Sequence, residues 1–128
     1  EVFVADCSNH RVSVHDLDGA FVRSFGSHGS GAGQFDCPLG LAISAETVFV
    51  ADCDNRRVAV HGLDGTFLRS FGSEGSGDGQ FQCPADLAVT EDRVYVVDTS
   101  NHRISVHGLD GRFLFAFGSE GVKLFAHL

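Results

Sequence analysis

The chain has 128 residues, of which 43% are hydrophobic and 20% charged, and its formal net charge is −8 at pH 7. The few cations are spread along the sequence without a basic run, which argues against binding to nucleic-acid phosphates, and the acidity would repel anionic membranes. No apolar run approaches 18 residues and no signal-peptide pattern is present, so we expect a soluble, intracellular protein. Met is absent, which indicates a processed product or an excised piece of a longer chain.

One pattern occurs three times at a spacing of 46 residues. It reads VFVADCSNHRVSVHDLDG at 2–19, VFVADCDNRRVAVHGLDG at 48–65 and VYVVDTSNHRISVHGLDG at 94–111. Positions 2–47 and 48–93 are identical at 30 of 46 sites. A strand-rich repeat of about 45 residues is typical of a β-propeller blade.

The middle copy predicts four short strands in chain order. Two apolar runs at 41–43 and 48–51 are followed by a polar turn at 52–56 and an alternating strand at 57–61. An Asp-Gly hairpin then leads into a fourth strand at 66–71, and a Gly-rich connector at 72–79 crosses to the next copy. A single blade cannot bury its apolar faces, so neighbouring blades must stack. We expect the repeated phenylalanines to pack between blades: Phe25, Phe35, Phe71, Phe81 and Phe117.

The pattern GxGQFxxPxxLAVxxxxxVYVxDxxNxRIxVHxxDGxFLxxFG resembles the NHL repeat. The turn residues that carry the resemblance stand at 8–11, 54–57 and 100–103, and the likeness extends over residues 1–121. It implies a propeller, usually of six blades, that serves as a binding platform for proteins or RNA and is rarely catalytic by itself. The RNA-binding members have strongly basic faces, which this chain lacks.

The resemblance predicts an all-β fold with three blades in the chain. Residues 1–37 form a first blade that lacks its innermost strand, 38–83 a second, 84–121 a third, and 122–128 an apolar tail that is a candidate closing strand. Because an open arc of three blades exposes an apolar face at each end, we expect two chains to close a six-bladed homodimeric ring. The alternative is an excised fragment of a longer propeller.

The four cysteines occupy two positions of the repeat. Cys7 and Cys53 are equivalent, as are Cys37 and Cys83, and the third copy has Thr99 at the position of Cys7 and Cys53. We expect four buried, reduced thiols. A hairpin centred at 45–46 would bring Cys37 close to Cys53, so a disulfide between these two remains an alternative. No spacing of Cys or His suggests a zinc site.

Polar residues shared by all three copies are interpreted as a structural turn network rather than a ring of cation ligands: Asp6, Asn9, Arg11, Asp52, Asn55, Arg57, Asp98, Asn101 and Arg103. In this interpretation Asp accepts turn amides, Asn adopts an unusual backbone conformation and Arg pairs with Asp. His15, His61 and His107 also recur, but on different blades they lie too far apart to bind one metal ion. The Gly-rich connectors lack the helix and lysine of phosphate-binding loops, so no cofactor and no metal are expected.

Positions that differ between copies fall in the turns and connectors, where loops on a rigid scaffold often carry function. The candidate partner-binding residues are His10, Arg56, His102, Asp36, Gln82 and Asp86. The first three would form a modestly positive arc suited to an acidic or polar peptide. The predicted function is a non-catalytic scaffold for a protein or peptide. The alternatives are a self-assembling fragment without a ligand and a cation-dependent propeller hydrolase or lyase.

Overall fold

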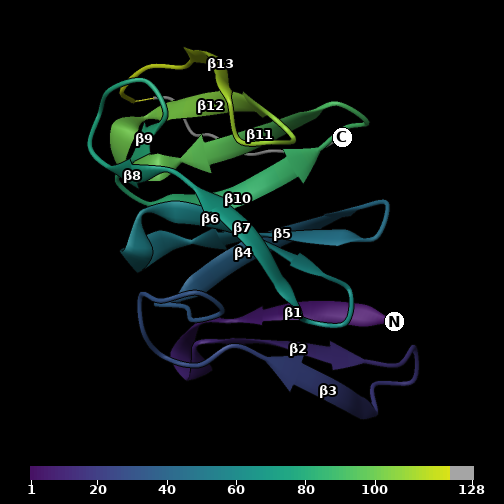
Figure 1. Cartoon of the computed structure of the whole chain (residues 1–128). Coiled ribbons are helices and arrows are strands. Elements are labelled where there is room, and N and C mark those ends of the chain that lie inside the picture. The colour runs from purple at the N-terminus through teal and green to yellow at the C-terminus, as the bar shows by residue number, and fades with distance from the viewer. Residues whose placement is uncertain (122–128) are drawn as a thin grey trace.

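A computed structural model describes residues 1–121, which form β-strands, connecting loops and three single-turn 3₁₀ helices. The first sheet has three antiparallel strands: β1 (Val2–Asp6), β2 (Arg11–His15) and β3 (Phe21–Phe25). The second has four: β4 (Pro38–Ser44), β5 (Thr47–Asp52), β6 (Arg57–Gly62) and β7 (Phe67–Phe71). The third also has four: β10 (Pro84–Val89), β11 (Arg93–Asp98), β12 (Arg103–Gly108) and β13 (Phe113–Phe117). In each sheet, strands adjacent in sequence pair with one another, and the three sheets follow one another through the molecule as blades 1, 2 and 3 (Figure 1).

The expected all-β architecture of twisted, four-stranded antiparallel sheets is confirmed. Within blade 2, β5 is buried from Val48 to Asp52 because it is an interior strand and its sheet is covered on both faces. The β6–β7 hairpin closes through Gly65, whose φ of +94° lies in the region that glycine adopts without strain. A Cβ at Gly65 would also meet the ring of Phe25 on blade 1, so this glycine lets neighbouring blades approach closely.

At one end of each blade, a 3₁₀ turn links two strands: η1 (Cys7–Asn9), η2 (Cys53–Asn55) and η3 (Thr99–Asn101). The Gly-rich connectors that cross to the next blade begin and end at this same end. In the second connector, β8 (Ser73–Glu74) pairs in parallel with β9 (Gln80–Phe81). We call this end of the blades, with its η turns and connectors, the connector face.

The core lies between the sheets, and the connector phenylalanines fill it. Phe35 packs with Val12, Val48 and Val50 at the first junction between blades, and its exposure is 0%. Phe81 occupies the equivalent place at the second junction and is also fully buried. Burying a phenylalanine side chain contributes about 1.5–3 kcal/mol, so these two rings are main determinants of blade stacking.

The outer faces of the array differ from the interior junctions. Phe117 is 49% exposed, in contrast to the buried rings between blades, because no blade follows it among residues 1–121. At each interior junction an arginine, here called a clasp arginine, hydrogen-bonds to a backbone carbonyl of the next blade. Arg23 donates to the Leu63 carbonyl at 2.6 Å, and Arg69 donates to the Leu109 carbonyl at 2.6 Å.

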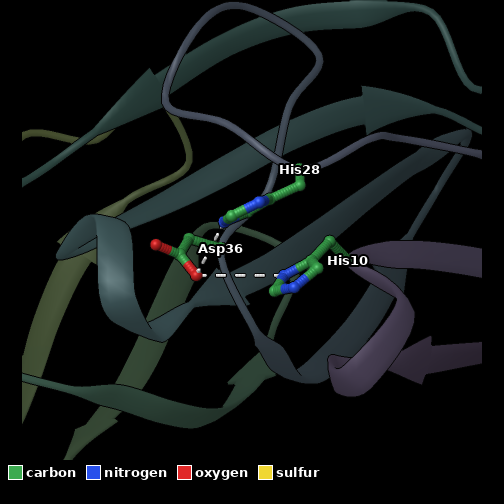
Figure 2. Close-up of side chains that lie close together, drawn as sticks. All are labelled: His10, His28 and Asp36. Carbon is green, nitrogen blue, oxygen red and sulfur yellow. Dashed lines mark ion pairs between the residues drawn. The ribbon is translucent and has the colours of Figure 1, made fainter.

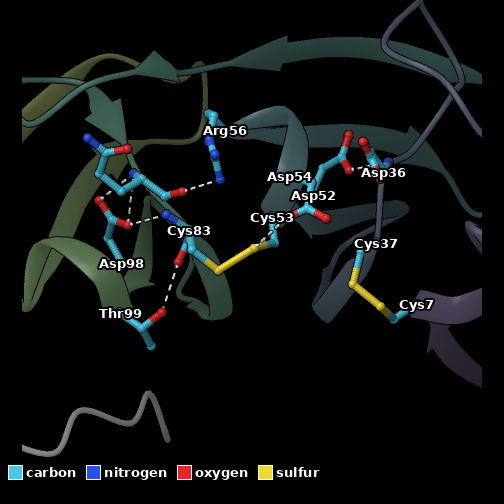
Figure 3. The surroundings of a disulfide bond; sticks show 11 residues. Cys7, Asp36, Cys37, Asp52, Cys53, Asp54, Arg56, Cys83, Asp98 and Thr99 are labelled. Atoms are coloured by element: carbon cyan, nitrogen blue, oxygen red, sulfur yellow. Dashed lines mark hydrogen bonds between the residues drawn. A yellow bond between two sulfur atoms is a disulfide. The ribbon is translucent and has the colours of Figure 1, made fainter.

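The expectation of reduced thiols is wrong, because the structure pairs Cys7 with Cys37 and Cys53 with Cys83 (Figure 3). The alternative pair is not formed either, although β4 and β5 do place Pro38 opposite Asp52 and so bring Cys37 near Cys53. Cys37 has a left-handed backbone, with φ of +59°, and forms its bond with the turn of the preceding blade. Each disulfide therefore ties an η turn to the connector that leads into the next blade. The separation of 30 residues, which both pairs share, is the signal in the sequence from which this pairing could have been inferred.

Candidate functional site

The repeated Asp, Asn and Arg residues hold the connectors to the η turns. In blade 2, Asp52 is fully buried and its Oδ1 accepts the Asp36 amide at 2.8 Å, while its Oδ2 accepts from Asn55 at 2.9 Å and from Arg57 Nε at 3.0 Å. Burial raises the pKa of Asp52, and these three donors act against that shift. Asn55 also donates to the Gly29 carbonyl at 2.8 Å, so the network reaches the preceding connector.

The other two blades show variants of the same network. In blade 3, Asp98 accepts the amides of Gln82 and Cys83 and the side chain of Asn101. The Arg103 guanidinium donates instead to the connector carbonyls of Ser76, Gly77 and Gln80. In blade 1, Asp6 accepts from Asn9 and Arg11, and the hydrogen bond from Asn9 is the main cause of its lowered pKa. The partners of these Asp, Asn and Arg side chains are residues of the η turns and connectors, so the network serves the structure of the blades.

One detail of the sequence interpretation is wrong. The unusual backbone conformation belongs to the residue after Asn, since His10, Arg56 and His102 have φ between +52° and +56°. This left-handed residue sends its side chain toward the next connector. His10 Nδ1 accepts the Cys37 amide at 3.0 Å, and Arg56 donates to the Gln82 carbonyl at 2.6 Å.

The structure places the six expected partner-binding residues in different surroundings. His10 lies beside Asp36 at the first junction, and Arg56 contacts Gln82 at the repeat-equivalent place in the second. His102 is exposed on blade 3. Asp86 lies on the inner strand β10, against Gly40 of β4, and its carboxylate accepts its own neighbour's amide, that of Leu87. His10 and Arg56 are thus partly committed to the connectors, and the positive arc is weaker than the sequence suggested.

A cluster of titratable side chains forms at the first junction from His10, His28 and Asp36 (Figure 2). The Oδ1 atom of Asp36 lies 3.5 Å from His28 Nε2 and 3.8 Å from His10 Nδ1. The two imidazole rings stack with centroids 4.1 Å apart. His28 was counted from the sequence among the variable positions of the expected face, but not among the six candidate partner-binding residues. The signal for it was the difference between copies, because Glu74 and Glu120 stand at its equivalent positions.

The histidines that recur on strands serve in packing. His61 lies within 5.2 Å of the rings of Phe25 and Phe35, and His107 lies in the same way against Phe71 and Phe81. Burial lowers the pKa of both imidazoles. Because each is enclosed at a different junction, these histidines cannot share a ligand, as the sequence analysis expected.

Comparison with known proteins first defines the class. A hydrazine synthase from Kuenenia stuttgartiensis superimposes with a TM-score of 0.70 at 12% identity, over 92% of this chain and 32% of that one. A putative exported protein from Bacteroides fragilis superimposes with a TM-score of 0.61 at 15% identity, over 91% of this chain and 31% of that one. At such identities the likeness concerns the fold alone. The sheets of this chain are propeller-like blades.

The sequence comparisons then specify the repeat. Residues 81–106 match the family model described as the NHL repeat. The RING finger protein nhl-1 of Caenorhabditis elegans is 60% identical over 43 residues, which are 34% of this chain and 4% of that protein. The predicted NHL repeat is therefore confirmed. Among the described residues, no helix is long and apolar enough to cross a membrane.

Proposed function

We propose that this chain is a non-catalytic propeller scaffold of the NHL type that binds a protein or peptide on its connector face. The observation that carries the proposal is that conserved-looking positions of the repeat and variable ones make different contacts: residues shared by the copies hold the framework together, and residues that differ include the exposed ones on the connector face. The Asp, Asn and Arg side chains common to the copies bind one another and the connector backbone, whereas several positions of the turns and connectors that differ between copies are exposed, among them Asp54, Glu74 and Asp78. A rigid framework with variable loops is the usual construction of a binding platform.

The charges on this face favour a basic partner segment over the acidic one that the sequence suggested. His10 and Arg56 are directed to the connectors, while four exposed acidic residues point to solvent from the turns and connectors: Asp54, Glu74, Asp78 and Glu120. Opposite charges steer association and fix the register of a complex. A peptide rich in Lys or Arg is therefore the class of ligand that we propose.

The repeats supply the variants for a test. Asp54→Ser, Glu74→His and Asp78→Ala each introduce the residue that the first copy has at the same place. We expect the triple variant to bind a panel of Lys- and Arg-rich peptides at least about tenfold more weakly, as measured by fluorescence polarisation. The control is Glu91→Ala, on the opposite end of blade 3, where the middle copy has Ala45. Equal binding by the triple variant and the native chain would refute the basic-peptide proposal.

We further propose that a second copy of the chain covers the two outer faces and closes a six-bladed ring. Val2 and Val4 of the first sheet are 45% and 42% exposed, although their equivalents Val48 and Val50 are completely buried at an interior junction. At the other end, Phe115 is 42% exposed where blades 1 and 2 have the clasp arginines. Both faces are thus apolar surfaces of the kind that is buried between blades. The tail 122–128, expected to pair near Val2, lies outside the described residues.

Light scattering coupled to gel filtration tests the closure. We expect the native chain to have the mass of a dimer, twice the chain mass of 13.6 kDa. The Val4→Asp variant should have the mass of a monomer. The monomer mass for the native chain at micromolar concentration would overturn the ring and favour the fragment alternative.

The disulfides bear on the compartment. Such bonds form and persist in oxidising environments and are rare in the cytosol. We therefore propose an oxidising compartment in place of the intracellular one expected from the sequence. Thiol labelling of the protein isolated from its natural source should find no reactive cysteine. Four labelled cysteines would refute the proposed oxidising compartment.

A further inference from the structure

We propose that His10, His28 and Asp36 bind one divalent transition-metal ion, for which Zn²⁺ is the probe. One ligand atom from each residue lies within 4.8 Å of the others. Bonds of about 2.0–2.1 Å in a tetrahedral arrangement place ligand atoms roughly 3.3 Å apart. The Asp36 carboxylate is already 3.5 Å from His28 Nε2 and 3.8 Å from His10 Nδ1, so small side-chain rotations bring all three into range.

The hydrogen bond to His10 suits this role. Its Nδ1 accepts the hydrogen of the Cys37 amide at 3.0 Å, so a lone pair is present on that nitrogen. An ion at Nδ1 takes the place of the amide hydrogen and requires no change of tautomer. The single neutral hydrogen bond that is given up contributes little to stability beside the binding energy of a zinc site.

The framework holds two of the ligands in place before an ion arrives. His10 follows the η1 turn and Asp36 lies in the connector, and the Cys7–Cys37 disulfide joins these two segments. The Asp36 amide is also fixed to the buried Asp52 carboxylate. His28 is exposed and belongs to the same connector, where it forms a bridge with Phe35. Preorganised ligands lose less conformational entropy on binding, which raises affinity.

The ligand set selects the class of metal. Two imidazole nitrogens and one carboxylate oxygen suit Zn²⁺, Cu²⁺ or Ni²⁺, whereas Ca²⁺ and Mg²⁺ prefer sets made of oxygen alone. Three protein ligands leave a fourth tetrahedral position for water. The site goes beyond the proposed scaffold function and does not depend on it.

The second junction provides an internal comparison. Arg56, Glu74 and Gln82 stand at the equivalent positions, and the Arg56 guanidinium already binds the Gln82 carbonyl. The same backbone thus exists in this chain without the cluster. Two of the three proposed ligands therefore have a non-ligating replacement that the fold already accommodates: His10→Arg and Asp36→Gln.

Isothermal titration of the oxidised, untagged chain with Zn²⁺ at pH 7.5 tests the site. Ellman's reagent first verifies that no free thiol is present to bind zinc. We expect one ion per chain, with affinity reduced more than about tenfold in H10R and in D36Q. His102→Arg removes the equivalent histidine of blade 3 and should leave binding unchanged, and Ca²⁺ should give no saturable heat.

Several results would overturn the proposal. They are no saturable binding of Zn²⁺ by the native chain, undiminished binding by H10R and D36Q, or equal loss in H102R. Circular dichroism shows whether each variant is folded. As a second readout, the ring signals of His10 and His28 in NMR spectra should shift on addition of one equivalent of Zn²⁺, and those of the buried His107 should not. Shifts confined to other histidines would also refute the site.

Discussion

Among residues 1–121, the Nε2 atom of His61 has no hydrogen-bond partner, because residue 59 is alanine. In blade 3 the same atom of His107 lies 2.8 Å from the hydroxyl of Ser105, and in blade 1 that of His15 lies 3.1 Å from Ser13. Ala59 is buried and stands at the position of these serines. The middle blade therefore contains a buried polar atom without a hydrogen-bond partner among the described residues, whereas the equivalent atoms in the other two blades each have a serine hydroxyl as partner.

Replacing Ala59 with Ser should stabilise the protein. The new hydroxyl supplies the missing partner, and the site already accepts serine in the other two blades. We expect the free energy of unfolding to rise by about 1 kcal/mol, as measured by urea denaturation. The complementary change Ser105→Ala should lower it by about 1–3 kcal/mol, since it leaves the Nε2 atom of His107 unsatisfied. A destabilised A59S variant would show that the hydroxyl does not reach His61.

Mild acid should destabilise the fold through His61 and His107. Burial lowers the pKa of both in the folded state, so the unfolded chain, with imidazole pKa values of about 6.5, takes up protons first. The contribution of these two neutral histidines to the free energy of unfolding is complete above pH 6.5 and is lost as the pH falls below that value. The melting temperature should therefore be lower at pH 5.5 than at pH 7.5.

A matched variant separates this effect from other titrations. The double change of His61 and His107 to Gln should flatten the pH dependence between those two values. Burial raises the pKa of Asp52, so its contribution runs in the opposite sense and remains in both proteins. An unchanged slope in the double variant would assign the acid sensitivity to other groups.

The disulfide pairing can be mapped directly. Cleavage after Arg and Glu separates Cys37 from Cys53, because Glu46 lies between them. Mass spectrometry without reduction should find Cys7 linked to Cys37 and Cys53 linked to Cys83. A peptide that links Cys37 to Cys53 would contradict the structure.

Loss of one disulfide should be costly. Each bond closes a loop with a separation of 30 residues, which corresponds to about 3–4 kcal/mol in the loop-entropy model. We expect the double variant Cys53→Ser/Cys83→Ser to lose stability of that order in urea. The comparison protein is the native chain under oxidising conditions, and an unchanged unfolding midpoint would contradict the expectation.

Asp52→Asn should be strongly destabilising. The buried carboxylate accepts from Asp36, Asn55 and Arg57, and an amide would turn a donor toward one of them. Breaking a buried ion pair in this way costs about 3–5 kcal/mol, which thermal or urea unfolding would detect. The matched change Asp6→Asn, at the equivalent but only half-buried position of blade 1, should have a clearly smaller effect. Equal effects at the two sites would indicate that burial does not set the strength of the network.

The sequence was a good guide wherever a feature depends on local pattern. The 46-residue period, the alternation at 57–61 and the Asp-Gly pair before Thr66 define strands and hairpins, because side-chain direction and glycine φ are decided over a few residues. The same copies also separated framework residues from variable ones. Differences at 10, 28 and 36 marked the place of the candidate site, but not its chemistry.

Contacts between distant segments were decided by the tertiary structure. Cys37 is near Cys53 in the hairpin register, yet its left-handed backbone and the stacking of blades give it Cys7 as a partner. The convergence of His10, His28 and Asp36 has the same origin, because it depends on where a Gly-rich connector crosses from one blade to the next. Periodicity in a sequence specifies the repeating unit, whereas the contacts across a junction depend on how two units pack.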